Sequence, residues 1–258
     1  VNEGAMIRRI YRSGGEFQWV REFVVNAIEA GAKRIHLGIE WQAVKSTGVY
    51  RRIILDDGCG MNREELMRFF SEFGGGGKHV GGAHDNYGMG AKVSALPWNP
   101  NGLVVISYKD GRGSMICLQE DENGRFFLQD FQADSAPPTA CADPSDVGEW
   151  MGCRWGDLRP EWLTDHGTII VMLGSDDNRD TIRGDPGANE DSLAGTILYI
   201  NRRFWNPQCE ITVDYPIVAD RSEWPKEPGS KTLHRRRAVG LEYFLREAKV
   251  DGHLDCSG

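Results

Sequence analysis

The chain has 258 residues, of which 40% are hydrophobic and 26% are charged, so it can bury the core of one large or two small domains. Its net charge of −8 gives no general attraction to nucleic acid, and no apolar run approaches the roughly 20 residues of a membrane helix. The six cysteines are scattered without metal-ligand spacing, which indicates reduced thiols in a cytoplasmic protein. Because the sequence begins at Val1 rather than Met, we expect it to be a fragment of a longer protein.

The first predicted element is a helix from Phe17 to Ala30, where apolar residues recur at helical spacing. Glu22, Asn26 and Glu29 share the opposite side of that helix. An Asn oxygen suits Mg²⁺, and a carboxylate one turn away can orient and deprotonate a water molecule. The spacing therefore favours metal-assisted attack on a phosphate. The alternative is that Glu22 is an ordinary solvated helix residue.

Two predicted strands follow, and the second one, 50–55, ends at a pair of acids, Asp56 and Asp57. A carboxylate at this point can accept a hydrogen bond from an exocyclic amino group, while Gly58 and Gly60 let a flat base such as adenine approach the backbone. The sequence does not decide which acid does so. An Asx turn is the alternative interpretation.

A second helix and a glycine-rich segment come next. Asn62 and Glu65 have the spacing of a capping box before an amphipathic helix. Six glycines within 74–82 predict a mobile loop or lid. Gly88 and Gly90 then open another helix, whose free N–H groups at the positive end of the helix dipole can bind an anion.

The second half of the chain alternates between strands and irregular segments. Residues 133–165 hold four prolines and three tryptophans without periodicity, so we expect an irregular excursion that its tryptophans anchor. We interpret Arg235–Arg237 as a solvated turn rather than a contact with phosphate or DNA. The further strands that we expect are 103–108, 114–119, 125–131, 167–173 and 211–215, and the further helices are 192–203 and 239–249.

In order, these motifs resemble those of the GHKL ATPases, a superfamily that includes gyrase-type topoisomerases, heat-shock chaperones, MutL-type repair proteins, histidine kinases and MORC proteins. The resemblance covers about residues 16–173. It implies a Bergerat-type α/β fold, an α+β sandwich with a mixed, mostly antiparallel sheet and helices on one face. It also implies an ATP-binding domain at 1–175 and a C-terminal extension at 176–258 that could begin a transducer-like domain. The Tyr-Gly form of the last glycine motif is most similar to MORC-like and heat-shock-chaperone-like members.

The resemblance also assigns roles to residues. It makes Glu22 the general base that polarises the attacking water and Asn26 the Mg²⁺ ligand. Asp56 would bind the adenine amino group, with support from Thr168 through water. Val25 stands where the family often has Asp, a departure from the pattern. The other implied nucleotide contacts are Glu29, Gly58, Gly60, Met61, the lid residues Gly76, Gly77 and Lys78, and Tyr87, Gly88, Met89, Gly90, Ala91 and Lys92.

The implied activity is Mg²⁺-dependent binding and hydrolysis of ATP by a conformational or dimerisation switch. We expect an ATP-dependent homodimer and a protein partner or further domains within a larger machine of the defence, repair or chromatin type. The charge gives no indication of nucleic acid, and His79 and His84 lack the partners of a zinc site. The alternatives are a histidine-kinase-type catalytic domain and a nucleotide sensor that does not hydrolyse ATP.

Overall fold

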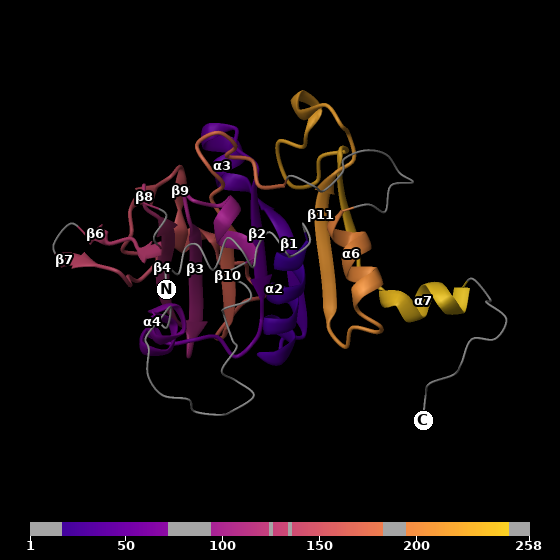
Figure 1. Cartoon of the computed structure of the whole chain (residues 1–258), viewed down its shortest axis with the longest axis horizontal. Helices are drawn as coiled ribbons and strands as arrows, with labels where there is room; N and C mark the ends of the chain where they lie inside the picture. Colours follow the sequence, from indigo (N-terminus) through magenta and orange to yellow (C-terminus); the bar gives the residue numbers. More distant parts are fainter. Residues whose placement is uncertain (1–16, 72–93, 124–125, 134–135, 183–194, 248–258) are drawn as a thin grey trace.

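The computed structural model describes residues 17–71, 94–123, 126–133, 136–182 and 195–247, and an eight-stranded sheet runs through them in the order β12-β11-β1-β2-β10-β3-β4-β5 (Figure 1). β1 and β11 pair in parallel, whereas every other neighbouring pair in this sheet is antiparallel. The sheet is therefore mixed and mostly antiparallel, as predicted. Its strands are β1 (Arg34–Glu40), β2 (Arg51–Asp56), β3 (Leu103–Lys109), β4 (Arg112–Glu120), β5 (Phe126–Leu128), β10 (Gly167–Met172), β11 (Glu210–Pro216) and β12 (Leu233–Arg237).

Helices cover one face of this sheet. α2 (Gln18–Glu29) buries its apolar stripe there, and α4 (Arg63–Ser71), α6 (Thr196–Arg203) and the 3₁₀ helix η1 (Leu96–Trp98) share the same core. The stripe of α2 follows helical spacing, so its apolar side chains meet the sheet while its polar ones turn away. The buried residues of α2 are Trp19, Val20, Phe23, Val24 and Ala27.

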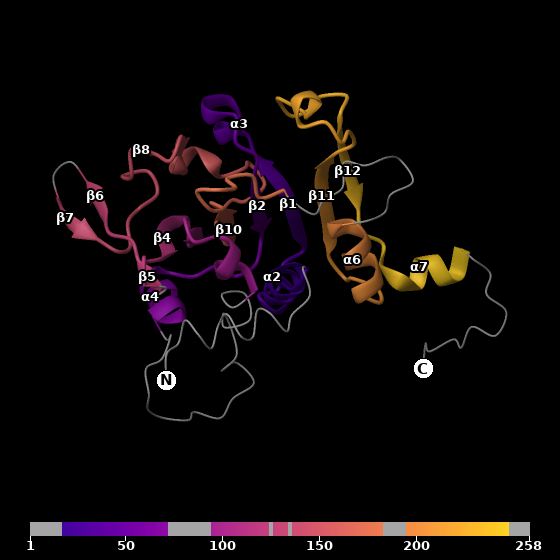
Figure 2. The same cartoon turned by 45° about the horizontal axis from the view of Figure 1, so that its top comes forward.

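The predicted excursion packs on the opposite face. After β5 the chain leaves the large sheet, so the single strand expected at 125–131 is wrong: β6 (Phe131–Ala133) pairs with β7 (Ala136–Thr139) in a hairpin of its own (Figure 2). A second small hairpin, β8 (Glu149–Trp150) with β9 (Cys153–Arg154), leads into η2 (Trp155–Leu158).

Two of the three tryptophans anchor this excursion directly. Trp155 is fully buried beneath it, and Trp150 packs on both Trp155 and Phe131, with ring centroids 5.7 and 5.6 Å apart. Together with buried side chains of β2, β3, β4 and β10 they form a second hydrophobic cluster. The anchoring role expected for these tryptophans is confirmed.

Two further elements were not predicted from the sequence. α3 (Trp41–Thr47) begins where both carboxylate oxygens of Glu40 accept backbone N–H groups and ends at Gly48 in the left-handed region. The second is β12. The interpretation of Arg235–Arg237 as a solvated turn is wrong, because this segment pairs with β11 at the edge of the sheet. Asp214 on β11 accepts hydrogen bonds from Arg235, which gives the edge strand an ion pair across the ladder.

Residues after 195 continue the same sheet and the same core. β11 lies against β1 in register with Arg34–Leu37, and Ile197 and Ile200 of α6 join the core beneath α2. α7 (Gly240–Glu247) projects away from the sheet (Figures 1 and 2). The division of the chain near residue 175 stays a prediction. No helix among the described residues is long and apolar enough to cross a membrane.

Candidate functional site

A row of polar side chains crosses four strands on the helix-covered face. Asp56 at the end of β2 is the register partner of Thr168 on β10, which is in turn opposite Ser107 on β3, and Ser107 is opposite Ser114 on β4. The residues two positions away on each strand belong to the core beneath the helices, so strand periodicity places all four on that face. The row lies at the end of the sheet where β2 stops and β10 begins.

Asp56 is the one acid among these four side chains, and its pKa is strongly shifted. Its side chain is buried, and its Oδ1 accepts the N–H of Gly58 at 2.9 Å. Oδ2 accepts no hydrogen bond from a described residue. Burial raises the pKa of Asp56 to about 7, the Gly58 N–H opposes that shift, and the charge of Asp57 adds to it. One carboxylate oxygen is thus available for a donor brought by a ligand.

Asp57 has a different environment. Its Oδ1 accepts the backbone N–H groups of Lys33 and Arg34, at 2.7 and 2.8 Å. We call residues 56–61 the acidic turn. These contacts hold the acidic turn against the start of β1. The two acids that the sequence left undecided therefore differ in surroundings, because one is turned toward the helices and the other toward the backbone of a neighbouring strand.

The glycines of the turn are surrounded by protein atoms. A Cβ on Gly58 would stand 2.7 Å from the Cβ of Ala30, and one on Gly60, where φ is +62°, would stand 1.8 Å from the carbonyl oxygen of Tyr108. Both glycines are thus required for the packing of the turn itself. The contact of either glycine with a base stays a prediction.

The same turn is held from two sides. Cys59 donates its N–H to the carbonyl of Ala30 just after α2, at 2.9 Å. Met61 donates its N–H to Oγ of the buried Ser107 at 2.8 Å, and that oxygen lies 3.4 Å from Oγ1 of Thr168. The hydroxyl of Ser107 therefore ties the acidic turn to the position of Thr168.

The polar side of α2 ends beside this turn. Ala30 donates its N–H to the carbonyl of Asn26, so Asn26 lies one helical turn before the contact with Cys59. The side-chain amide of Asn26 is partly exposed and forms no hydrogen bond with a described residue. It can therefore hold an external ligand. Glu29, on the last turn of α2, is exposed to solvent.

Glu22 is engaged by its own helix. Its Oε1 accepts from Nε2 of Gln18 at 2.6 Å and lies 2.5 Å from an Arg21 guanidinium nitrogen. The Glu22 side chain is only 15% exposed. Both contacts are made by Oε1, so Oε2 accepts no hydrogen bond from a described residue and is available to a water molecule.

The capping box predicted after the turn is confirmed. Asn62 donates its N–H to Glu65, and Glu65 donates its own to Oδ1 of Asn62, both at 2.9 Å. Lys109 on β3 also binds both oxygens of Glu65, at 2.7 and 2.8 Å. These contacts fix the start of α4 directly after the turn.

Sequence reasoning missed Ser107 and Ser114. Both interrupt apolar strands at positions that period-two alternation assigns to the buried face, and this is the signal that could have found them. The residues predicted to meet the lid and the phosphates lie outside the described residues: Gly76, Gly77, Lys78, Tyr87, Gly88, Met89, Gly90, Ala91 and Lys92. The described residues contain no cluster of three or more His, Cys, Asp or Glu side chains suited to a metal.

Residues 17–127 match the family model described as "Histidine kinase-, DNA gyrase B-, and HSP90-like ATPase". This part of the chain is therefore similar to the ATPases of the GHKL superfamily. The match includes α2, the acidic turn and α4, and ends before Thr168. The specific similarity to MORC-like members stays a prediction.

Two solved structures resemble the chain at low identity. The ATP-binding domain of topoisomerase IV of Francisella tularensis, in complex with a small-molecule inhibitor, is 15% identical with a TM-score of 0.44, over 89% of this chain and 51% of that one. The 43K ATPase domain of Thermus thermophilus gyrase B, in complex with an aminocoumarin, is 13% identical with a TM-score of 0.46, over 92% and 50%. The chain thus spans about half the length of these structures. No curated protein matches it.

Proposed function

We propose that this chain binds ATP with Mg²⁺ and hydrolyses it slowly, as a switch that changes shape or dimerises within a larger machine of the defence, repair or chromatin type. The observation that carries the proposal is Asp56, a buried carboxylate with one oxygen available to a ligand in a segment that matches an ATPase family. A dimer in the ATP-bound state and a protein partner belong to the same proposal.

Asp56 would select adenine by hydrogen-bond polarity. The exocyclic amino group of adenine is a donor, which Oδ2 of Asp56 can accept, whereas guanine presents a carbonyl acceptor at the same ring position. An acceptor facing an acceptor leaves a buried polar group unpaired. We expect the hydroxyls of Thr168 and Ser107, the next members of the row, to hold the water that supports this contact.

The metal and the water would be handled on α2. The amide oxygen of Asn26 is a suitable Mg²⁺ ligand, and the bound ion would neutralise charge on the phosphates. Glu22, one turn earlier, would orient the water in line with the terminal phosphate through Oε2, the oxygen that contacts neither Arg21 nor Gln18. We expect Gly88 and Gly90 to donate backbone N–H groups to the phosphates.

Glu22→Ala tests the catalytic part of the proposal. Since general-base catalysis contributes about 10²- to 10⁴-fold, phosphate release should fall by at least about 10²-fold, while the Kd for ATP stays within a few fold. Phosphate release and nucleotide titration measure the two quantities. Glu64→Ala, which removes an exposed acid from the first turn of α4, is the control and should leave both unchanged.

A nucleotide sensor without hydrolysis is the second candidate, and the contacts of Glu22 with Arg21 and Gln18 favour it. In that case the wild-type chain binds ATP but releases no phosphate. Equal turnover by wild type and Glu22→Ala would instead show that Glu22 is not the general base. Nucleotide titration would then be the test of the ATP site.

A further inference from the structure

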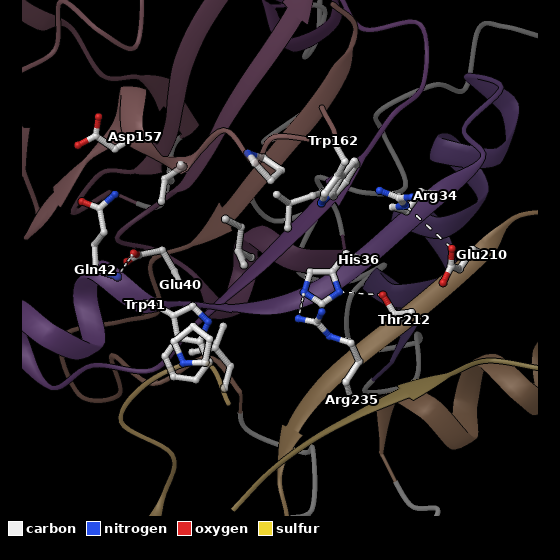
Figure 3. Close-up of a pocket in the computed structure, with 16 residues that line it drawn as sticks. Arg34, His36, Glu40, Trp41, Gln42, Asp157, Trp162, Glu210, Thr212 and Arg235 are labelled. Atoms are coloured by element: carbon white, nitrogen blue, oxygen red, sulfur yellow. Dashed lines mark hydrogen bonds and ion pairs between the residues drawn. The ribbon is translucent and has the colours of Figure 1, made fainter. Parts of the chain in front are cut away.

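A cavity of about 550 Å³ opens on the face of the sheet opposite α2 (Figure 3). Arg34 and His36 of β1, Thr212 of β11 and Arg235 of β12 lie at one end of it. Trp41, Gln42 and Asp157 lie at the other end. Strand periodicity separates this cavity from the candidate nucleotide site, since Leu55 lines the cavity while Asp56 faces the helices.

Arg34 presents a positioned cation at the first end. Its guanidinium carbon lies 5.1 Å from the centre of the Trp162 ring, a cation–π contact that restrains the plane of the group. Its side chain has one ion pair among the described residues, a distant contact of 4.0 Å from Nε to Glu210. Its terminal N–H groups are therefore available to a ligand, and a planar fork of donors suits a carboxylate.

Neighbouring polar groups hold this end in place. Nδ1 of His36 lies 2.8 Å from Oγ1 of Thr212, and its Nε2 lies 3.4 Å from Oδ2 of Asp214. Asp214 is 1% exposed and accepts from both Nε and a terminal nitrogen of Arg235. The ion pair thus supports the cavity wall and leaves Arg235 with further donors.

The acids at this end limit the negative charge that a ligand can carry. Arg34 and Arg235 face Glu210 and Asp214, and Arg52, buried behind β1, contributes a further positive charge that interacts with Asp214. Burial lowers the pKa of Arg52 to about 10, so it stays protonated at neutral pH. A carboxylate brings one negative charge to this end, whereas a phosphate dianion brings two and would meet stronger repulsion from Glu210 and Asp214. Two further acids, Glu40 and Asp157, line the far end of the cavity.

Between its two ends the cavity is largely apolar. Ile39, Ile53 and Leu55 of the sheet line it, with Leu158 and Pro160 of the excursion beside them. Trp41 adds a second indole ring at the far end (Figure 3). A cavity with apolar walls and a few convergent polar groups is the usual form of a small-molecule site.

We propose that this cavity binds a small carboxylate with a flat apolar body, the carboxylate on Arg34 and the body along the apolar walls toward Trp41. None of the residues that line this cavity was assigned to the candidate nucleotide site.

Calorimetric titration of the whole chain with 2-naphthylacetate tests the site. We expect saturable binding of the acid, and binding of its neutral amide, 2-naphthylacetamide, to be weaker by about tenfold or more because the charge-assisted hydrogen bonds are lost. Arg34→Gln should remove this preference for the acid while keeping the backbone N–H that Asp57 accepts. Arg203→Gln, an exposed arginine on α6, is the matched control and should retain it.

Four results would overturn the proposal. They are the absence of saturable binding by the acid, equal affinities of acid and amide, an Arg34→Gln variant that binds the acid as tightly as wild type, and tighter binding of 2-naphthyl phosphate than of the acid. The midpoint of thermal unfolding is measured for Arg34→Gln as well. An unchanged midpoint shows that a loss of binding comes from the missing guanidinium and not from unfolding.

Discussion

Asp56 and Asp57 are neighbours in the sequence, but their carboxylates accept hydrogen bonds from different donors. In Asp56→Asn only one amide oxygen remains for both the Gly58 N–H and the adenine amino group. One donor is then left unpaired, so ATP binding should weaken by about 1–3 kcal/mol. Asp57→Asn keeps an oxygen for the Lys33 and Arg34 N–H groups and should leave ATP affinity unchanged. Nucleotide titration of both variants distinguishes them, and the reverse order would assign adenine to Asp57.

The raised pKa of Asp56 also has a consequence for stability. Because its folded-state pKa is about 7 and the ordinary value is 3.8, the folded chain holds a proton between these values that the unfolded chain releases. The free energy of unfolding should therefore fall as the pH rises from about 4 to 7, by at most about 1.4 kcal/mol per pH unit from this group.

Urea unfolding at pH 5, 6 and 7 measures that slope, and Asp56→Asn should reduce it. Asp214 does not obscure the comparison. Burial opposes its ionisation, but the hydrogen bonds from Arg235 and His36 prevail and hold the pKa of Asp214 at about 2, so its contribution to stability is lost only in stronger acid. Identical slopes for wild type and Asp56→Asn would show that Asp56 is not buried as described.

For single residues, the sequence predicted which side chains could form the site better than it predicted their hydrogen-bond partners. The motif spacing identified Asp56 and Asn26 as candidates. It did not choose between Asp56 and Asp57, because period-two alternation gives a side-chain direction only when the covered face of the strand is known. It also missed Ser107, whose contacts with Met61 and Thr168 join segments more than forty residues apart.

Among the elements, the acidic turn depends on the absence of a side chain at Gly60. An alanine there would take a left-handed conformation and would also collide with the carbonyl of Tyr108. Strain of about 1–2 kcal/mol and overpacking of about 1–3 kcal/mol together predict a loss of roughly 2–5 kcal/mol in unfolding free energy.

Gly48→Ala is the matched control for this substitution. Gly48 has a similar φ, +71°, but no atom within 4 Å of the added Cβ. It should cost only the strain of about 1–2 kcal/mol. Chemical denaturation of both variants gives the comparison, and equal losses would mean that the turn can move away from β3 without penalty.

The elements that the sequence predicted well have long, periodic apolar patterns, as α2 and β3 do. The missed ones are short or are determined by distant residues. α3 has seven residues, and its start depends on the carboxylate of Glu40. The Arg235–Arg237 run resembles a solvated segment locally, and only its pairing with β11 and Asp214 makes it a strand.

In the whole molecule, β1 joins the two parts of the chain. It pairs with β2 on one side and with β11 on the other, although about 170 residues separate β1 from β11. A local sequence pattern cannot reveal such a parallel pairing, because the two strands have no turn in common. The expected boundary near 175 followed from a polar, glycine-containing segment and not from the pairing of strands.

Truncation after residue 182 tests how far the two parts depend on each other. It removes β11 and α6, leaves β1 as an exposed edge, and deletes five large side chains from the core. At about 1.5–3 kcal/mol each, their burial is comparable to the 5–15 kcal/mol that stabilises a typical domain. The deleted core residues are Ile197, Ile200, Ile211, Val213 and Tyr215.

We therefore expect residues 1–182 to unfold at much lower temperature than the whole chain or to aggregate. Truncation after residue 238, which removes only α7 and the residues beyond it, is the control and should cost far less because α7 projects from the sheet. Calorimetry of the three chains gives the answer. The opposite result would be a cooperative transition of residues 1–182 within a few degrees of the whole chain. That result would establish an ATP-binding domain that ends near residue 175 and whose core is complete without β11 and α6.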